Sequence, residues 1–181
     1  MVLERLKLDG KVAIVTGAGR GLGRQMALAL AEAGADVVCA ARTAEQVERT
    51  AEDIRARGRR AVAHPTDVRD SAQCDGLIAR AASEFGRLDI MLSNAGIGDM
   101  RGANSELWDV DDADWRDTLD VNLSSAFYCA RAASKPLAPR RPPNVRAATT
   151  RRPARLTTRA ILRWSAVVRP SSRMFVTLRL K

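Results

Sequence analysis

The residues best suited to chemistry form a glycine-rich run near the start of the chain, Thr16-Gly17-Ala18-Gly19-Arg20-Gly21-Leu22-Gly23. A β-branched run precedes it and an Ala/Leu-rich run follows it. A glycine-rich turn between a strand and a helix lets the backbone approach a phosphate, and the helix N-terminus offers free N–H groups with a partial positive charge. The turn therefore suits the pyrophosphate of a nucleotide. A flexible loop is the alternative interpretation.

The segments that must position this turn alternate between strand and helix patterns. Strands are predicted at 11–16, 35–41, 60–64 and 88–92, and helices at 22–33, 43–57, 70–85 and, as one or two helices, 111–133. Such alternation predicts βαβ units and a parallel sheet with helices on both faces. The acidic run within 109–120 is interpreted as the cap and polar surface of a helix that buries Trp115 and Leu119.

Composition divides the 181-residue chain near residue 133. Residues 134–181 hold 13 of the 30 basic residues and none of the 21 acidic ones, and all 12 glycines lie at or before Gly102. We therefore predict a dinucleotide-binding domain at 1–133 and an irregular Arg/Pro-rich tail at 134–181. Residues 135–143 are too proline-rich for a helix or a central strand, whereas 156–168 suit a basic helix and 174–180 suit a strand.

Two interpretations of this tail stay open. Its Arg, Pro, Ala and Thr content is typical of a GC-rich gene translated in a shifted frame, which would replace a natural second half. Alternatively, it is an arm that binds nucleic acid or an acidic membrane surface, and its charge of +13 predicts non-specific, salt-dependent binding to polyanions in either case.

The remaining composition excludes several classes of protein. No run of 18 apolar residues is present, so no membrane span is expected, and residues 1–11 lack the apolar core of a signal peptide. Three widely spaced cysteines, Cys39, Cys74 and Cys129, predict neither a disulfide framework nor a zinc site. They fit a reducing cytoplasm, which is the expected location, and no metal site is predicted.

Three further motifs follow the glycine-rich turn in order. Asp67-Val68 comes after the third predicted strand, Asn94-Ala95-Gly96 comes after the fourth, and Asn122 lies in Asp-Val-Asn-Leu. With Thr-Gly-x-x-x-Gly-x-Gly, these motifs resemble the short-chain dehydrogenase/reductase (SDR) family over about residues 7–133. The resemblance implies an α/β Rossmann-type doubly wound parallel sheet, incomplete here because only strands 1–4 of the family order 3-2-1-4-5-6-7 are expected.

The resemblance also implies a set of site residues. Asn122 is the counterpart of the family's catalytic asparagine. The implied cofactor-binding residues are Gly17, Arg20, Gly21, Leu22, Gly23, Arg42, Asp67, Val68, Asn94, Ala95 and Gly96.

The residues after the second predicted strand bear on the choice of cofactor. NAD-preferring family members usually carry an acidic residue there, whereas this chain has Ala41 followed by Arg42. Arg20 adds a second guanidinium inside the glycine-rich turn. Because arginine binds phosphate through bidentate, charge-assisted hydrogen bonds, the pair predicts NADP(H) rather than NAD(H). Two solvated surface arginines are the alternative.

Most of the family's catalytic set has no counterpart. Family members use a Ser and a Tyr-x-x-x-Lys motif for proton exchange with a carbonyl/alcohol substrate. The single tyrosine here is Tyr128, and Ala132 stands where the lysine would be. The sequence therefore predicts one of two functions. One is an NADP(H)-linked oxidoreductase by resemblance, expected to be inactive in this chain. The other is a non-catalytic dinucleotide-binding remnant with a polyanion-binding tail.

The incomplete sheet has a predicted physical cost. Strand 4 is expected to be an unpaired edge, which favours aggregation or capture of another strand. Segment 174–180 is a candidate to cover it. We therefore expect a marginally stable or aggregation-prone protein. Family members usually form homo-oligomers, but the contacts made by their later segments are not expected here.

Overall fold

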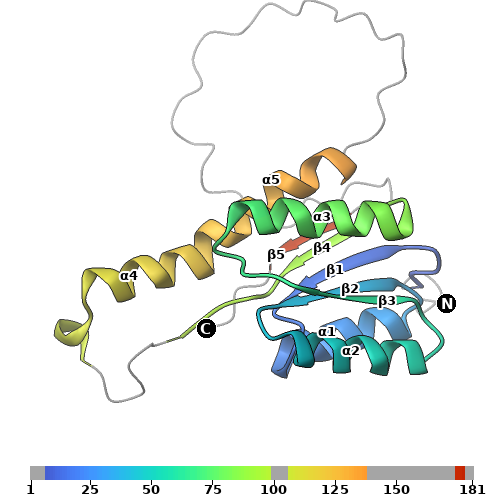
Figure 1. Cartoon of the computed structure of the whole chain (residues 1–181), viewed down its shortest axis with the longest axis horizontal. Helices are drawn as coiled ribbons and strands as arrows, with labels where there is room; N and C mark the ends of the chain where they lie inside the picture. Colours follow the sequence, from blue (N-terminus) through green and yellow to red (C-terminus); the bar gives the residue numbers. More distant parts are fainter. Residues whose placement is uncertain (1–6, 99–105, 138–173, 178–181) are drawn as a thin grey trace, which may run out of the picture.

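The strand that precedes the glycine-rich turn, β1 (Val12–Thr16), is buried along its whole length. The computed structural model describes residues 7–98, 106–137 and 174–177 of the chain. In it, β1 is the central strand of a parallel sheet with the order β3-β2-β1-β4-β5 (Figure 1). The other strands are β2 (Asp36–Ala41), β3 (Ala61–Pro65), β4 (Ile90–Ser93) and β5 (Met174–Thr177). The order β3-β2-β1-β4 confirms the predicted Rossmann-type sheet.

Helices cover both faces of this sheet. Helices α1 (Gly21–Glu32) and α2 (Ala44–Ala56) lie on one face, and α3 (Ser71–Phe85) and α5 (Ser125–Leu137) lie on the other (Figure 1). Neighbouring strand residues face opposite cores: Val15 and Leu92 pack with α1 and α2, whereas Ile14 and Met91 pack with α3 and α5. Burial on both faces explains why the strands read as continuous apolar runs.

The buried carboxylate of Asp89, directly before β4, is hydrogen-bonded to β1 and paired with the half-exposed Arg87. The Asp89 side chain is only 1% exposed and accepts hydrogen bonds from Val12 N (3.0 Å) and from two nitrogens of Arg87 (both 2.7 Å). Burial alone would raise the pKa of Asp89, but the hydrogen bonds from Arg87 and Val12 and the nearby positive charges leave it below its ordinary value. The carboxylate is therefore held ionised at the start of the strand.

The segment predicted as helix at 111–133 contains two helices. They are α4 (Asp112–Leu119), which begins at the capping carboxylate of Asp111, and α5, and a π-helical turn at Asp120–Ser124 joins them. The expectation that α4 buries Trp115 is wrong, because this side chain is 58% exposed. Figure 1 shows the reason: α4 projects beyond the sheet, so no described layer covers it. Trp108, in the short 3-10 helix Leu107–Asp109, is 81% exposed.

The tail departs from its prediction at its start, whereas the strand predicted at 174–180 is present at Met174–Thr177. Helix α5 extends to Leu137 and contains Pro136. A proline in the last turn removes only one intrahelical hydrogen bond, which the helix tolerates. Strand β5 pairs in parallel with β4, from Ile90 opposite Met174 to Ser93 opposite Thr177. The expectation of an unpaired edge at β4 is therefore wrong, since a tail segment supplies the missing backbone partners. The expected helix at 156–168 lies outside the described residues.

Candidate functional site

A cleft of about 550 Å³ opens beside the glycine-rich turn. Segments that follow β1, β2, β3 and β4 form its walls, because the carboxyl ends of parallel strands meet at one edge of a sheet. All eleven residues predicted to bind a cofactor line it: Gly17, Arg20, Gly21, Leu22, Gly23, Arg42, Asp67, Val68, Asn94, Ala95 and Gly96. Thus motifs spread over some 80 residues of sequence come together in one depression.

The glycine-rich turn is shaped by close backbone contacts. Gly17 has a φ of +69°, and a Cβ there would lie 2.9 Å from Nδ2 of Asn94. A Cβ at Gly23 would collide with the carbonyl oxygen of Gly17 and with the same Asn94 amide. Only glycine fits at these two positions, so α1 can begin close to the ends of β1 and β4.

Thr16 and Asn94 tie the ends of β1 and β4 together. The Thr16 hydroxyl accepts hydrogen bonds from the backbone N–H groups of Asn94 (3.0 Å) and Ala95 (3.1 Å), and Asn94 Nδ2 donates to Thr16 O (3.1 Å). Two of these bonds use the Thr16 hydroxyl and one uses the Asn94 side chain, and together they support the sheet. They fix the floor of the cleft between the glycine-rich turn and the Asn-Ala-Gly segment.

The N-terminus of α1 faces this cleft without a side-chain cap. Arg20 occupies the N-cap position in an extended conformation, and its side chain makes no capping hydrogen bond. In contrast, Asp70 caps α3 by accepting from Ala72 N (2.8 Å) and Gln73 N (3.4 Å). The first-turn N–H groups of α1 therefore remain available to an anion, with the favourable end of the helix dipole behind them.

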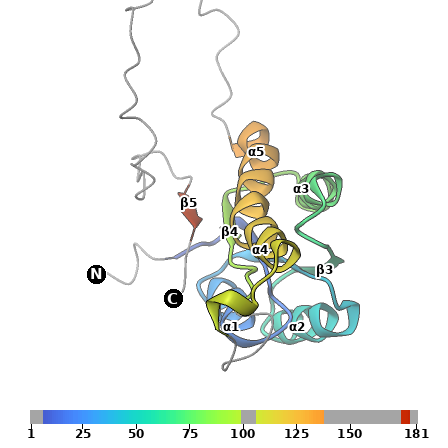
Figure 2. The same cartoon turned by 90° about the vertical axis from the view of Figure 1, so that its left-hand side faces the viewer.

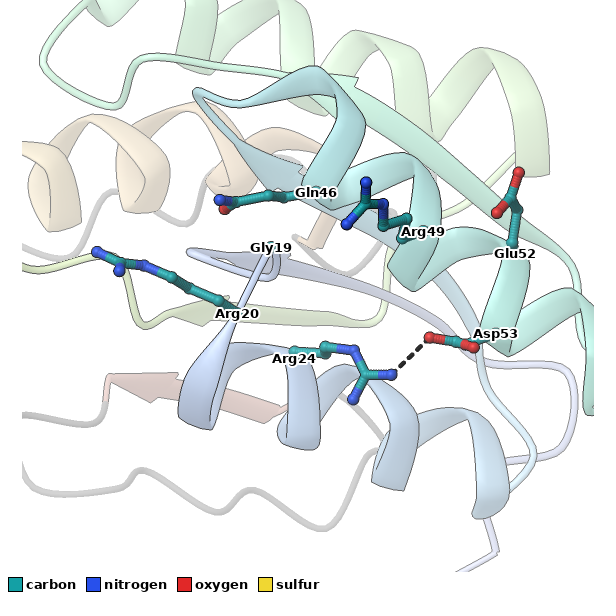
Figure 3. A pocket seen from close by; sticks show the side chains of 7 residues that line it. All are labelled: Gly19, Arg20, Arg24, Gln46, Arg49, Glu52 and Asp53. Atoms are coloured by element: carbon teal, nitrogen blue, oxygen red, sulfur yellow. Dashed lines mark hydrogen bonds and ion pairs between the residues drawn. The ribbon is translucent and has the colours of Figure 1, made fainter.

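Two exposed arginines stand at the rim of the cleft. Arg42 follows β2, and Arg20 also lines a second pocket between α1 and α2 (Figure 3). In that second pocket Arg24 donates to Asp53 at 2.6 Å, and Arg49 extends from α2 toward Gly19 (Figure 3). The charge of Arg24 is balanced by Asp53. Arg20, Arg42 and Arg49 are the residues that add further positive charge around the glycine-rich turn.

Asp67 contributes a paired carboxylate rather than a free one. Its oxygens accept hydrogen bonds from Arg69 at 2.6–3.1 Å, and Arg69 also donates to Asp117 of α4 at 2.7 Å. The Arg69 hydrogen bonds are the main cause of a lowered pKa of Asp67, and the charge of Arg42 acts in the same direction. Asp67 is therefore ionised and paired with Arg69, and it is one of the residues that line the cleft.

Asn122 lies in the π-helical turn and outside the lining of the cleft. Its Oδ1 accepts from Ile97 N at 2.9 Å, and its Nδ2 donates to Ile97 O at 2.9 Å. The side chain therefore fixes the segment after Gly96, and the adjacent Val121 lines the cleft instead. Tyr128 is half-buried on α5, packs against the core beside α3 and is absent from the described cleft lining.

Sequence reasoning missed several lining residues. They are Gly19, Ala41, Thr43, Gln46, Thr66, Ile97 and Val121. Most of them are next to a predicted motif in the sequence. Their location directly after the end of a predicted strand could therefore have identified them. Val121 reaches the cleft from the π-helical turn and stands beside Asn122 in the Asp-Val-Asn-Leu motif, whereas Gln46 reaches it from α2 and no motif marks it. Among the described residues, no cluster of His, Cys, Asp and Glu could hold a metal ion, and no helix is long and apolar enough to cross a membrane.

A parallel sheet covered on both faces, with a glycine-rich phosphate cradle after its central strand, defines a Rossmann-type fold. The sequence matches the family described as short chain dehydrogenase over residues 11–145. The chain belongs to that family, whose members use a nicotinamide dinucleotide.

Individual relatives match over the same part of the chain. It is 39% identical over 135 residues to 2-dehydro-3-deoxy-D-gluconate 5-dehydrogenase of Escherichia coli, covering 75% of this chain and 51% of that protein. The structure of a short chain dehydrogenase from Burkholderia cenocepacia in complex with NADP is similar, with a TM-score of 0.68, 37% identity, and coverage of 72% and 52%.

A 7α-hydroxysteroid dehydrogenase complexed with NADH and 7-oxo glycochenodeoxycholic acid is also similar, with a TM-score of 0.66, 33% identity, and coverage of 72% and 49%. The chain spans about half the length of the curated relatives it matches. One similar structure holds NADP and another NADH, so the likeness alone does not distinguish the two cofactors.

Proposed function

We propose that this chain binds NADP(H) in the cleft beside the glycine-rich turn. The observation that carries the proposal is the convergence of all eleven predicted binding residues on one cleft. The close backbone packing at Gly17 and Gly23 fixes the shape of the turn in which a pyrophosphate would lie, and the uncapped start of α1 supplies hydrogen-bond donors for it. The site therefore fits a dinucleotide.

The preference for NADP(H) rests on charge. Arg20 and Arg42 are exposed at the cleft rim, and the residue at the end of β2 is Ala41 rather than an acid. Two guanidinium groups favour a 2′-phosphate, since each can form bidentate, charge-assisted hydrogen bonds with it. An acid in place of Ala41 would instead favour the two hydroxyls of an NAD ribose.

The chain's own residues support binding more than catalysis. When bound, the nicotinamide would supply hydride chemistry, but a proton donor for a carbonyl oxygen must come from the protein. Tyr128 packs against the core, and position 132 is Ala132. Asn122 is engaged with Ile97, and we assign it a positioning role. We therefore propose a dinucleotide-binding protein of oxidoreductase ancestry that does not turn over carbonyl substrates by itself.

The direct test is a fluorescence titration of the full chain with NADPH and, separately, NADH. Saturable binding that favours NADPH supports the proposal, and equal affinity for both contradicts the assigned preference. NADPH oxidation is then followed with a panel of carbonyl substrates. Turnover abolished by Asn122→Ala would favour the second candidate, an active oxidoreductase.

Two further parts of the proposal concern the tail and the location. A polyanion-binding role belongs to the basic residues of 134–181, most of which lie outside the described residues. Binding to a nucleic acid that weakens steeply with salt would support it. A cytoplasmic location is supported by three buried free cysteines, and fractionation of the expressing cells tests it.

A further inference from the structure

Two buried cysteines face each other behind the wall of the cleft. Cys74 of α3 and Cys129 of α5 are 0% and 1% exposed, and their sulfur atoms are 3.8 Å apart although 55 residues separate them in sequence. The two helices lie side by side on one face of the sheet (Figure 1 and Figure 2). The third cysteine, Cys39, belongs to the core on the opposite face. The fold therefore selects one pair of thiols out of three.

The surroundings of the pair connect it to the cleft. The Cys74 thiol donates to the carbonyl oxygen of Val68 at 3.5 Å, and Val68 lines the cleft. Val121 also lines the cleft and packs in the same core cluster as both cysteines. Val68 is therefore the residue that separates a small solute in the cleft from the Cys74 sulfur.

The two thiols have different acidities. The Cys129 thiol donates a hydrogen bond to the Cys74 sulfur, which lowers the pKa of Cys74 despite its burial. The same interaction, together with burial, raises the pKa of Cys129. Because the thiolate is the nucleophilic form, we assign Cys74, which accepts the hydrogen bond, as the sulfur that reacts first. Burial raises the pKa of Cys39 to about 12, which keeps that thiol unreactive.

We propose that Cys74 and Cys129 are a peroxide-sensitive thiol pair that closes into a reversible disulfide between α3 and α5. The Cys74 thiolate attacks one oxygen of hydrogen peroxide, the O–O bond breaks, and after proton transfer water leaves and Cys74 carries a sulfenic acid. The Cys129 sulfur then attacks Cys74, the S–S bond forms, and the S–O bond breaks with release of a second water. Two thiols lose two electrons and two protons, and one peroxide is reduced to two waters.

Closure changes both walls of the cleft. A disulfide bond is about 2 Å long, so the two sulfurs must approach and the helices that carry them must adjust. The Cys74 thiol also ceases to donate to Val68 O. We therefore expect oxidation to weaken NADPH binding several-fold. This second part rests on the proposed function, whereas disulfide formation does not.

The test treats the full chain with hydrogen peroxide, alkylates the remaining thiols and maps the products by mass spectrometry without reduction. The expected product is a single Cys74–Cys129 cross-link, lost on reduction with dithiothreitol, with Cys39 alkylated only after unfolding. Cys39→Ser should still form the cross-link, whereas Cys129→Ser should stop at an oxidised Cys74. The cross-link is also mapped in the chain without substitutions, so the test stays valid if a variant fails to fold.

Three results would overturn the pairing: free thiols at all three positions, a cross-link that includes Cys39, or irreversible oxidation of Cys74 with no cross-link. NADPH titration of oxidised and reduced protein then tests the link to the cleft. Equal affinity in the two states would refute that link while leaving the disulfide established. Absence of NADPH binding in the reduced protein would instead refute the proposed function.

Discussion

The Asn122 side chain forms two hydrogen bonds with a single residue, Ile97, one from the backbone N–H and one to the carbonyl, each 2.9 Å long. This pairing joins the π-helical turn to the segment that follows Asn94-Ala95-Gly96. A Cβ at Gly96 would lie 3.1 Å from Asn122 Oδ1, so the contact leaves little spare room. The two hydrogen bonds between Asn122 and Ile97 therefore join the π-helical turn to the segment at the floor of the cleft.

We predict that Asn122→Ala loosens this connection. Two backbone groups of Ile97 lose their partner, which should cost about 2 kcal/mol in the free energy of unfolding. NADPH affinity should fall as well, because Ile97 and Ala95 line the cleft. Urea unfolding and NADPH titration measure the two effects. Ser134→Ala, on the exposed side of α5, is the control and should change neither.

Asp89→Asn should destabilise the sheet. The neutral amide cannot accept all the hydrogen bonds of the buried carboxylate, and Arg87 and Val12 N lose a charged partner. Because Asp89 is buried and Arg87 is half-exposed, the loss is that of hydrogen bonds to a charged group, about 1.5–3 kcal/mol in the free energy of unfolding. The exposed carboxylate of Asp75 provides the control, and Asp75→Asn should leave the urea midpoint at pH 7 nearly unchanged.

The same carboxylate predicts an acid dependence. The pKa of Asp89 in the folded protein lies below its ordinary value of 3.8. Its contribution to stability is therefore complete above that ordinary value and is lost as the pH falls through the lower, folded pKa. Urea midpoints of the parent chain should decrease as the pH is lowered from about 5 to 3, with a smaller decrease for Asp89→Asn. Parallel pH curves would contradict the assignment.

Two glycine-to-alanine changes should have opposite effects. At Gly23 a methyl group would collide with Gly17 O and the Asn94 amide, so Gly23→Ala should distort the turn and weaken NADPH binding at least about tenfold, or about 1.4 kcal/mol. At Gly76, in α3, a Cβ meets open space. Gly76→Ala should stabilise the protein by about 0.5–1 kcal/mol, because alanine favours a helix. Thermal unfolding and NADPH titration distinguish the two outcomes.

Arg42→Asp should reverse the cofactor preference. It removes a charge-assisted partner of the 2′-phosphate, a loss of about 1.5–3 kcal/mol, and places a carboxylate near the ribose hydroxyls. NADPH should bind more than about tenfold more weakly and NADH more tightly. Arg116→Asp, on α4, makes the same change in net charge away from the cleft and serves as the control. An unchanged NADPH/NADH ratio in Arg42→Asp would show that Arg42 is a surface residue only.

The sequence allowed prediction of those features that depend on local chemistry. Gly17 and Gly23 stand where close backbone contacts require glycine, and apolar runs mark strands that are buried on both faces. Features set by distant partners were not predictable. The exposure of Trp115 depends on where α4 projects, and the Cys74–Cys129 contact depends on the packing of two helices. The strand β5, by contrast, lies within the segment 174–180 that its own residue pattern predicted to be a strand.

The exposure of Trp108 and Trp115 has an optical consequence. Both indoles already face water in the folded protein, so their emission should lie at long wavelength before and after unfolding. Tryptophan fluorescence from these two positions should therefore follow collapse of the β1–β4 core poorly. Far-ultraviolet circular dichroism, dominated by the helices that cover the sheet, is the signal that reports whether the fold is intact.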